Sequence, residues 1–465
     1  MSEVVERLRQ VLPPEALVTD HDRMQSYRYD RAMFCPAGEP VAVVLARETA
    51  HVQAAVRAAA EFGVPVVPQG ARSGLSGAAN ALDGCVVISL EKMDRILQIE
   101  PIDRYVVTQP GVYNAVLSRA VAEQGLFYPP DPSSWEFCSI GGNLSTNSGG
   151  LCCVKYGVTT DYVLGLEVVL ASGEVLRTGR RTVKGVAGYD LTKLMVGSEG
   201  TLGIITEATL ALRPQTARPR TMAALFGSGV AAGEAIVEII RSGVSLSLLE
   251  IMDRTTIAAV NAYKRMDLPT EAAAMLIAQS DAGGEAGAAD IATVAKLCRD
   301  HGAIECIEAD DEAEGDLLLE ARRAALVALE QLGTTMIDDV CVPRSRLADF
   351  IGAVEKIAAD LDITVGVLGH AGDGNMHPTV VFDALDAEQA RRAQAAFDQI
   401  MEAGLALGGT ITGEHGIGVL KRAWLIEEIG PVAVAVHRAI KAALDPDNLL
   451  NPGKVVALEG ADTVR

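Results

Sequence analysis

Three of the chain's seven histidines stand in two short glycine-rich segments, the first of which reads as a turn. His370 and His377 belong to the first, residues 369–378, and His415 follows Glu414 in the second. Glycine removes side-chain bulk and allows a ligand to approach the backbone closely. Imidazoles combined with a carboxylate form a plausible ligand set for a divalent cation. We therefore expect the chemistry of the chain to lie at these two segments.

The composition indicates a globular protein that binds neither nucleic acid nor an anionic membrane surface. Its 465 residues allow two or three domains, and 49% are hydrophobic while 22% are charged. The net charge of -21 opposes polyanionic partners. Without a signal-like or bilayer-spanning apolar run, we expect a cytoplasmic location. The eight cysteines form no Cys-x-x-Cys pair, which opposes a zinc ribbon or iron–sulfur site and suits reduced thiols.

The order of apolar runs predicts an α+β protein in three parts. Residues 41–45 read as a strand, followed by a helix for which Thr49 is a good N-cap. A polar, proline-punctuated stretch at 213–219 marks a boundary. Beyond it, helices such as those near 287–301 and 344–361 alternate with strands such as that near 274–279, as in an α+β sandwich of ferredoxin-like type. We expect domains at residues 1–214 and 215–420, with a C-terminal helix and tail at 421–465 that pack back on the first domain.

Three loops of small residues lie in the first half of the chain. They cover residues 68–77, the run from 131 to 150 and residues 197–205. Backbone N–H groups and hydroxyls in such loops can cradle a pyrophosphate. No loop matches the Rossmann or P-loop pattern, and a single glycine-rich loop after a strand is common. Three of them in one domain favour a long ligand such as a dinucleotide.

Several of these segments together resemble a known flavoprotein family. The three loops, with residues 155–157 and 184–191, resemble the FAD-binding domain of the vanillyl-alcohol-oxidase, or PCMH, type. Residues 369–378, 413–418 and 448–454 resemble the FAD-linked 2-hydroxyacid dehydrogenases, which include the flavin subunit of glycolate oxidase and D-lactate dehydrogenases. The resemblance runs from about residue 29 to 454. It implies a two-lobed FAD-binding domain, an α+β substrate domain and a tail that returns to the FAD domain.

The resemblance implies that FAD is held without a covalent bond, because no histidine stands between His51 and His301. Simple turn chemistry is the alternative explanation for any single small residue. The residues that the family pattern assigns to FAD are Pro68, Gln69, Gly70, Ala71, Arg72, Ser73, Gly74, Leu75, Ser76, Pro130, Asp131, Pro132, Ser133, Ser134, Ile140, Gly141, Gly142, Asn143, Ser145, Thr146, Asn147, Gly149, Gly150, Glu199, Gly200, Gly203, Ile204, Ile205 and Asn451.

The resemblance also implies a divalent metal, zinc, manganese or similar, bound by His370, His377 and Glu414. His415 then matches the general base, and Arg322 matches an arginine that binds the substrate carboxylate. The alternatives are structural histidines with satisfied hydrogen bonds, and an arginine on the solvated face of a helix.

The implied activity is oxidation of a short D-2-hydroxyacid, glycolate or D-lactate, with hydride passing to flavin N5. Leu326 and Ile337 stand where relatives that oxidise D-2-hydroxyglutarate carry polar residues for a second carboxylate. Burying that carboxylate unpaired would be costly. D-2-hydroxyglutarate oxidation, a flavoprotein subunit of a larger electron-transfer complex, and a metal-dependent hydrolase remain alternatives, although the last leaves the three loops unused.

Electrons from the flavin need an acceptor outside the chain. We expect a partner subunit, a quinone, a cytochrome or an electron-transfer flavoprotein instead of O2. The chain would then be a homodimer or part of a hetero-oligomer, located in the cytoplasm or associated with a membrane through its partner.

Overall fold

The computed structural model describes residues 3–32 and 34–458, and its contacts form two compact units. The chain enters unit 2 after Gln215, beside the expected boundary at residue 214, and returns to unit 1 after Gly413, before the expected limit at residue 420. Unit 1 consists of Met1–Gly149, Val158–Gln215 and Glu414–Arg465, and unit 2 of Gly150–Gly157 and Thr216–Gly413.

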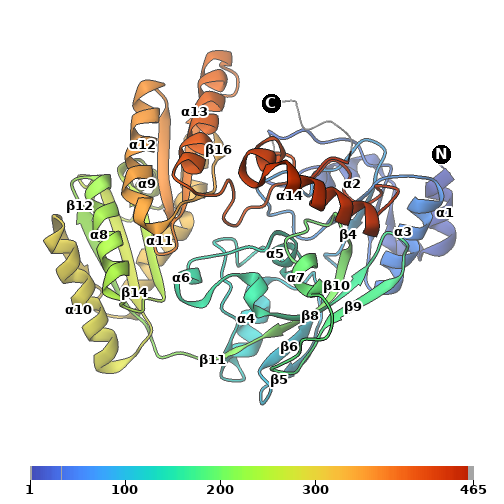
Figure 1. Cartoon of the computed structure of the whole chain (residues 1–465), viewed down its shortest axis with the longest axis horizontal. Helices are drawn as coiled ribbons and strands as arrows, with labels where there is room; N and C mark the ends of the chain where they lie inside the picture. The colour runs from blue at the N-terminus through green and yellow to red at the C-terminus, as the bar shows by residue number, and fades with distance from the viewer. Residues whose placement is uncertain (1–2, 33, 459–465) are drawn as a thin grey trace. The chain divides into compact units, whose positions relative to one another are not determined.

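Unit 1 contains two sheets (Figure 1). The first has the order β1-β2-β4-β3, with β2, β4 and β3 parallel, and α1 and α3 pack with it around a core of Val, Ala and Ile. Its elements are β1 (Leu17–Val18), β2 (Ala42–Leu45), β3 (Val66–Gln69), β4 (Val86–Ser89), α1 (Glu3–Val11), α2 (His21–Met24) and α3 (Thr49–Glu61).

The second sheet of unit 1 is antiparallel, with the order β5-β6-β10-β8-β9. The long C-terminal helix α14 and the tail after it also belong to this unit. The elements are β5 (Ile96–Glu100), β6 (Tyr105–Thr108), β8 (Val163–Val169), β9 (Val175–Gly179), β10 (Ile204–Ala211), the short pair β7 (Leu126–Phe127) and β11 (Arg213–Pro214), α4 (Asn114–Ala122), α5 (Ile140–Thr146), α7 (Leu191–Met195) and α14 (Arg422–Leu444).

Two local expectations for unit 1 were wrong. Glu48, not Thr49, is the N-cap residue of α3, because the Thr49 hydroxyl donates to Glu167 Oε1 at 2.6 Å instead. The run of small residues after Ser139 is not all loop, since seven of them form α5. Ser139 caps this helix by accepting a hydrogen bond from the N–H of Gly142 at 3.3 Å.

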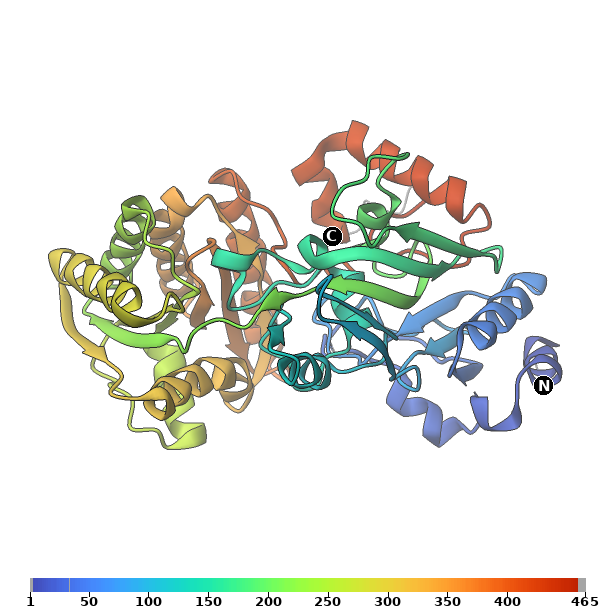
Figure 2. The same cartoon turned by 90° about the horizontal axis from the view of Figure 1, so that it is seen from below.

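Unit 2 is built on one eight-stranded sheet with the order β15-β12-β14-β13-β18-β19-β16, while β17 also pairs with β19. Helices pack on both faces of the sheet (Figure 2). The strands are β12 (Arg220–Phe226), β13 (Leu248–Asp253), β14 (Ala274–Ser280), β15 (Ala303–Glu308), β16 (Thr334–Ile337), β17 (Val340–Cys341), β18 (Thr364–His370) and β19 (Asn375–Phe382). The helices are α6 (Cys153–Tyr156), α8 (Gly229–Ser242), α9 (Arg254–Lys264), α10 (Gly284–Asp300), α11 (Glu312–Glu330), α12 (Leu347–Asp360) and α13 (Ala387–Ala406).

The short segment Gly150–Gly157 belongs to unit 2 although its neighbours in the sequence belong to unit 1. Lys155 and Tyr156 both bond to the carboxylate of Asp281, and Leu151 packs into the apolar core of unit 2. The Asp281 carboxylate accepts from both the Lys155 ammonium and the Tyr156 hydroxyl. These bonds explain why the segment packs with unit 2. Across the described residues, we find no helix that is both long and apolar enough to span a membrane.

Candidate active site

His370 and His377 lie on one tight β-hairpin, not in a glycine-rich turn as the sequence indicated. His370 ends β18, and His377 is the third residue of β19. His370 pairs with Asn375 in the antiparallel register, so His370 and His377 lie on the same face. Their ring centroids are 5.1 Å apart with the planes at 85°. The hairpin therefore brings together two imidazoles that the sequence separates by six residues.

Each of these imidazoles has a buried carboxylate at its Nδ1 side. His370 Nδ1 lies 2.8 Å from Glu250 Oε1, and His377 Nδ1 lies 3.6 Å from Asp339 Oδ1. Both carboxylates are fully buried. An acid at Nδ1 favours a proton there and leaves Nε2 available as a metal ligand. Each ring thus has a buried acid on its Nδ1 side, which leaves Nε2 as the nitrogen on the other side.

Glu414 and His415 follow Gly413, which is attached to the same strands. The N–H of Gly413 donates to the Asp339 carbonyl at 3.1 Å, and the Thr412 hydroxyl donates to Asp339 Oδ2 at 2.6 Å. A Cβ at residue 413 would lie 2.3 Å from the Asn375 side chain. This close approach explains the glycine.

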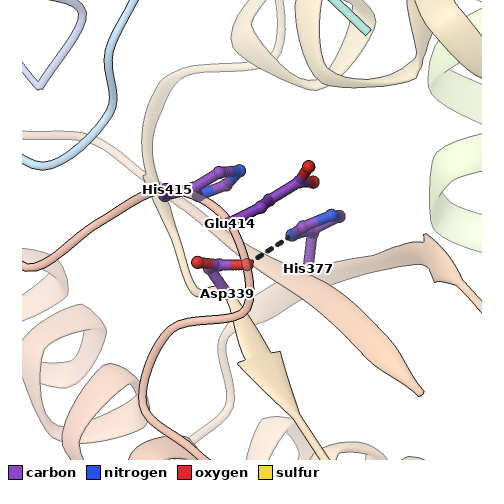
Figure 3. Close-up of side chains that lie close together, drawn as sticks. All are labelled: Asp339, His377, Glu414 and His415. Atoms are coloured by element: carbon purple, nitrogen blue, oxygen red, sulfur yellow. Dashed lines mark ion pairs between the residues drawn. The ribbon is translucent and has the colours of Figure 1, made fainter. Parts of the chain in front are cut away.

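Asp339, His377, Glu414 and His415 each offer a ligand atom, and these atoms lie within 4.8 Å of one another (Figure 3). Two imidazoles and two carboxylates suit a borderline divalent cation such as zinc or manganese, so the donor set fits the metal that the sequence implied. Asp339 sits at the Nδ1 side of His377 and accepts from Thr412, which is the position of an orienting group. His370, which the sequence proposed as a ligand, lies beside this cluster, next to His377.

Arg322 is buried at 2% exposure, so the alternative of a solvated helix face is wrong. Its Nε lies 2.8 Å from Glu250 Oε2. Its Nη2 is buried and has no hydrogen-bond partner among the described residues. A buried guanidinium N–H without an acceptor is costly, and a substrate carboxylate would satisfy it.

Glu250 and Asp339 are site residues that the sequence analysis missed. Glu250 stands alone in the apolar run 248–252, and Asp339 follows Asp338 between Ile337 and Val340. Acids that interrupt an apolar strand pattern are the signal that could have identified them, because burying such a group requires a specific partner.

The segment after His415 is held by Glu199 within unit 1. The N–H groups of Ile417 and Gly418 donate to Glu199 Oε1 and Oε2 at 2.7 and 2.8 Å. Burial raises the pKa of Glu199 to about 7, although these two hydrogen bonds oppose the shift. Glu199 was assigned to FAD from the sequence. Its carboxylate fixes the backbone that follows His415.

The three small-residue loops meet in unit 1. The N–H of Ala71 donates to Ser139 Oγ at 3.2 Å, and a Cβ at Gly70 would lie 2.4 Å from that same oxygen. A Cβ at Gly141 would lie 2.5 Å from Pro110. The buried hydroxyls of Ser76 and Ser148 have no hydrogen-bond partner among the described residues. Close-packed glycines with unsatisfied hydroxyls fit a phosphate-bearing cofactor such as FAD.

Some residues assigned to FAD also brace the loops. Gln69 donates to the carbonyls of Tyr27 and Ala79 at 2.8 and 2.7 Å. Asn451 Nδ2 donates to Ala78 O and Glu199 O at 3.2 and 2.8 Å.

Lys454 is a further brace, and the sequence gave it no role. Its Nζ donates to the carbonyls of Ala78 and Asn80 at 2.8 and 2.5 Å. Burial lowers the pKa of Lys454 to about 8. Through Lys454 and Asn451, the C-terminal tail thus connects the residues just after the first loop with Glu199 of the third.

Comparison with known proteins identifies the family. The family model "FAD binding domain" matches residues 40–179, and "FAD linked oxidases, C-terminal domain" matches residues 216–455. The chain is 41% identical to "Glycolate oxidase subunit GlcD" of Bacillus subtilis, across 99% of this chain and 98% of the relative. It is 35% identical to "D-lactate dehydrogenase" of Anaerostipes hadrus, across 97% of each.

A solved structure of p-cresol methylhydroxylase shares the fold, with a TM-score of 0.81 at 20% identity over 98% of this chain and 96% of that one. The α+β architecture with a PCMH-type FAD-binding domain is therefore confirmed. The chain belongs to the family of FAD-linked oxidases and is an oxidoreductase that uses FAD.

Proposed function

We propose that the chain oxidises a short D-2-hydroxyacid, glycolate or D-lactate, to the 2-oxoacid. The similar proteins from Bacillus subtilis and Anaerostipes hadrus carry the names of a glycolate oxidase subunit and a D-lactate dehydrogenase. The observation that carries the proposal is the cluster of His377, Glu414 and His415 around Asp339. It supplies metal ligands and a proton acceptor in one place.

The residues divide into ligands, orienting acids and a base. His370 and His377, through Nε2, and Glu414 would hold a divalent cation, while Glu250 and Asp339 keep the Nδ1 sides occupied. Such a cation supplies Lewis-acid stabilisation of the substrate's carboxylate and 2-hydroxyl oxygens. FAD would be held without a covalent bond by those residues of the three loops that make no bracing hydrogen bond. The FAD supplies the hydride acceptor, which is N5 of the flavin.

His415 takes the proton of the substrate 2-hydroxyl as C2 loses its hydride. Its neighbour Gly416 has a φ of 87°, a left-handed conformation that turns the chain sharply after His415. General-base assistance contributes about 10²–10⁴ in rate. Arg322 Nη2 binds the substrate carboxylate, which satisfies its buried N–H.

A short substrate is favoured by apolar residues at two positions. Ile337 is buried beside Asp338 at the end of β16, and Leu326 lies on α11, the helix that carries Arg322. Neither can pair with a second carboxylate. D-2-hydroxyglutarate is the second candidate substrate, and it requires a cation from a residue that the family pattern does not identify here.

The reduced flavin passes its electrons to an acceptor other than O2. A partner subunit, a quinone, a cytochrome and an electron-transfer flavoprotein are the candidates, and the name of the Bacillus subtilis relative, a subunit, supports the first. The chain would act in the cytoplasm as a homodimer or in a hetero-oligomer, which a membrane-bound partner could hold at a membrane.

A substrate panel tests this function. Purified flavin-loaded protein is assayed with a dye acceptor against glycolate, D-lactate, L-lactate and D-2-hydroxyglutarate. We expect turnover with glycolate or D-lactate and little with the other two. Turnover restricted to D-2-hydroxyglutarate, or to none of the four, contradicts the proposal.

A further inference from the structure

Glu250 lies in the middle of the unit 2 sheet, where a charged side chain is unexpected. It is the third residue of β13, which pairs with β14 on one side and β18 on the other. It is 0% exposed, and its strand neighbours Leu249 and Ile251 are apolar and buried. Burying a lone carboxylate costs several kcal/mol unless partners compensate. The position therefore needs an explanation from its contacts.

Two cationic or hydrogen-bonding partners reach this carboxylate from different elements. His370, at the end of β18, places Nδ1 2.8 Å from Oε1 and 3.0 Å from Oε2. Arg322, from α11, places Nε 2.8 Å from Oε2. One buried side chain thus contacts both a proposed metal ligand and the proposed carboxylate-binding arginine.

Stability alone does not account for this arrangement. A buried ion pair is often no more stabilising than apolar side chains of the same volume. The cross-strand partner of Glu250 in β14 is the apolar Ile277, so an apolar side chain would also complete the sheet at this position. The arrangement also leaves Arg322 Nη2 without a partner among the described residues, which a purely structural ion pair would avoid.

We propose that Glu250 is a positioning residue that sets both groups at once, an inference that rests on the proposed function. By accepting from His370 Nδ1, it fixes the tautomer in which Nε2 is unprotonated and can bind a cation. By pairing with Arg322 Nε, it turns the outer edge of the guanidinium, with Nη2, toward the substrate carboxylate. Glu250 itself touches neither the cation nor the substrate.

Glu250→Gln tests the proposal with little change of volume. The amide keeps an acceptor oxygen at only one of the two carboxylate positions, places an NH2 donor at the other, and removes the negative charge that pairs with Arg322. When its oxygen faces Arg322, its NH2 faces His370 Nδ1, and the imidazole proton moves to Nε2. A protonated Nε2 cannot bind a cation.

The primary measurement is Mn²⁺ titrated into metal-free, flavin-loaded full-length protein by calorimetry, without substrate. We expect Glu250→Gln to weaken Mn²⁺ binding about 10–100-fold while flavin absorbance is retained. In the Mn²⁺-saturated variant, KM for the substrate should rise more than kcat falls, because Arg322 loses its charged partner.

Asp253→Asn is the matched control on the same strand. Asp253 caps α9 through the N–H of Thr256 at 2.9 Å, and asparagine caps helices equally well. This variant should bind Mn²⁺ as the wild type does. Equal Mn²⁺ affinity in folded, flavin-loaded Glu250→Gln and wild type overturns the role of Glu250.

A second measurement needs no variant. Neutron diffraction from wild-type crystals should find a deuteron on His370 Nδ1 and none on Nε2. A deuteron on Nε2 overturns the inference even if Glu250→Gln fails to fold. Wild type that binds Mn²⁺ but oxidises no 2-hydroxyacid would contradict the proposed function while leaving the tautomer result intact.

Discussion

His370 and His377 each have a buried carboxylate on the Nδ1 side of the ring. Glu250 and Asp339 lie behind the rings, so the imidazole nitrogens on the opposite side are the ones presented for chemistry. The sequence identified the three late histidines and Glu414 from their glycine-rich surroundings. It could not identify the acids, because their partners stand 120 and 38 residues away in the chain, and only the sheet register brings them together.

His415→Ala should retain the flavin spectrum and lose substrate-dependent reduction by about 10²–10⁴-fold, since the 2-hydroxyl proton then has no base. Stopped-flow reduction by glycolate or D-lactate measures the effect. His437→Ala is the control, because it removes an exposed histidine on α14. Its flavin should be reduced by the substrate at the wild-type rate. A normal reduction rate in His415→Ala removes that residue from the mechanism.

At the scale of elements, the β18–β19 hairpin and the turn around His415 do most of the positioning. The sequence predicted strands and helices of unit 2 where apolar periodicity was clear, as at α10, α12 and β14. It read residues 369–378 as a turn because of their glycines, although a Cβ at Gly369 would lie 2.6 Å from Asn375 O across the hairpin. Here glycine serves close strand packing, which a sequence pattern does not distinguish from turn formation.

Gly416→Ala should lower kcat by about 10²-fold, because displacing a catalytic group by about 1 Å has an effect of that size. A Cβ there would lie 2.9 Å from the Glu199 carboxylate, and the backbone that carries His415 must shift. Gly430→Ala is the control. Gly430 has a similar φ of 77°, and a Cβ there would have no neighbouring heavy atom of the described residues within 4 Å. Both variants place a side chain at a positive φ, and only the first should lose turnover. Equal turnover in the two variants contradicts the role given to this turn.

Glu199 should make stability depend on pH. Its pKa is about 7 in the folded protein against 4.5 as the ordinary value, so between these values the folded state holds a proton that the unfolded chain releases. The free energy of unfolding therefore falls as pH rises through this window, by at most about 1.4 kcal/mol per pH unit.

Urea unfolding of flavin-loaded protein from pH 4.5 to 7 measures this slope. Glu199→Gln should flatten it, whereas Glu123→Gln, which changes an exposed carboxylate, should leave it unchanged. Parallel curves for wild type and Glu199→Gln would show that Glu199 does not titrate in this range.

At the scale of the whole molecule, the proposed FAD loops and most of the proposed metal and substrate residues belong to different units. The small-residue loops lie in unit 1 except for Gly150. His370, His377 and Arg322 lie in unit 2, while Glu414 and His415 lie in unit 1. The FAD-binding domain and the C-terminal domain could both be predicted from the sequence, because the small-residue loops and the histidine segments are local patterns.

Exhaustive chelation should lower turnover without releasing FAD, because none of the proposed metal ligands belongs to the small-residue loops. Turnover and the ratio of flavin to protein absorbance are measured before and after treatment, and Zn²⁺ or Mn²⁺ is then restored. Activity should return with the cation. Full activity in metal-free protein, or loss of flavin together with the metal, would contradict this separation.

The most direct measurement is a single turnover of the flavin in the absence of oxygen. Protein with oxidised FAD is mixed with glycolate or D-lactate, and the same substrates are compared with deuterium at C2. The account predicts that the visible flavin absorbance bleaches in one step, that deuterium slows it, and that the 2-oxoacid forms in equal amount. A flavin that stays oxidised with both substrates, while the protein is folded and metal-loaded, would contradict it.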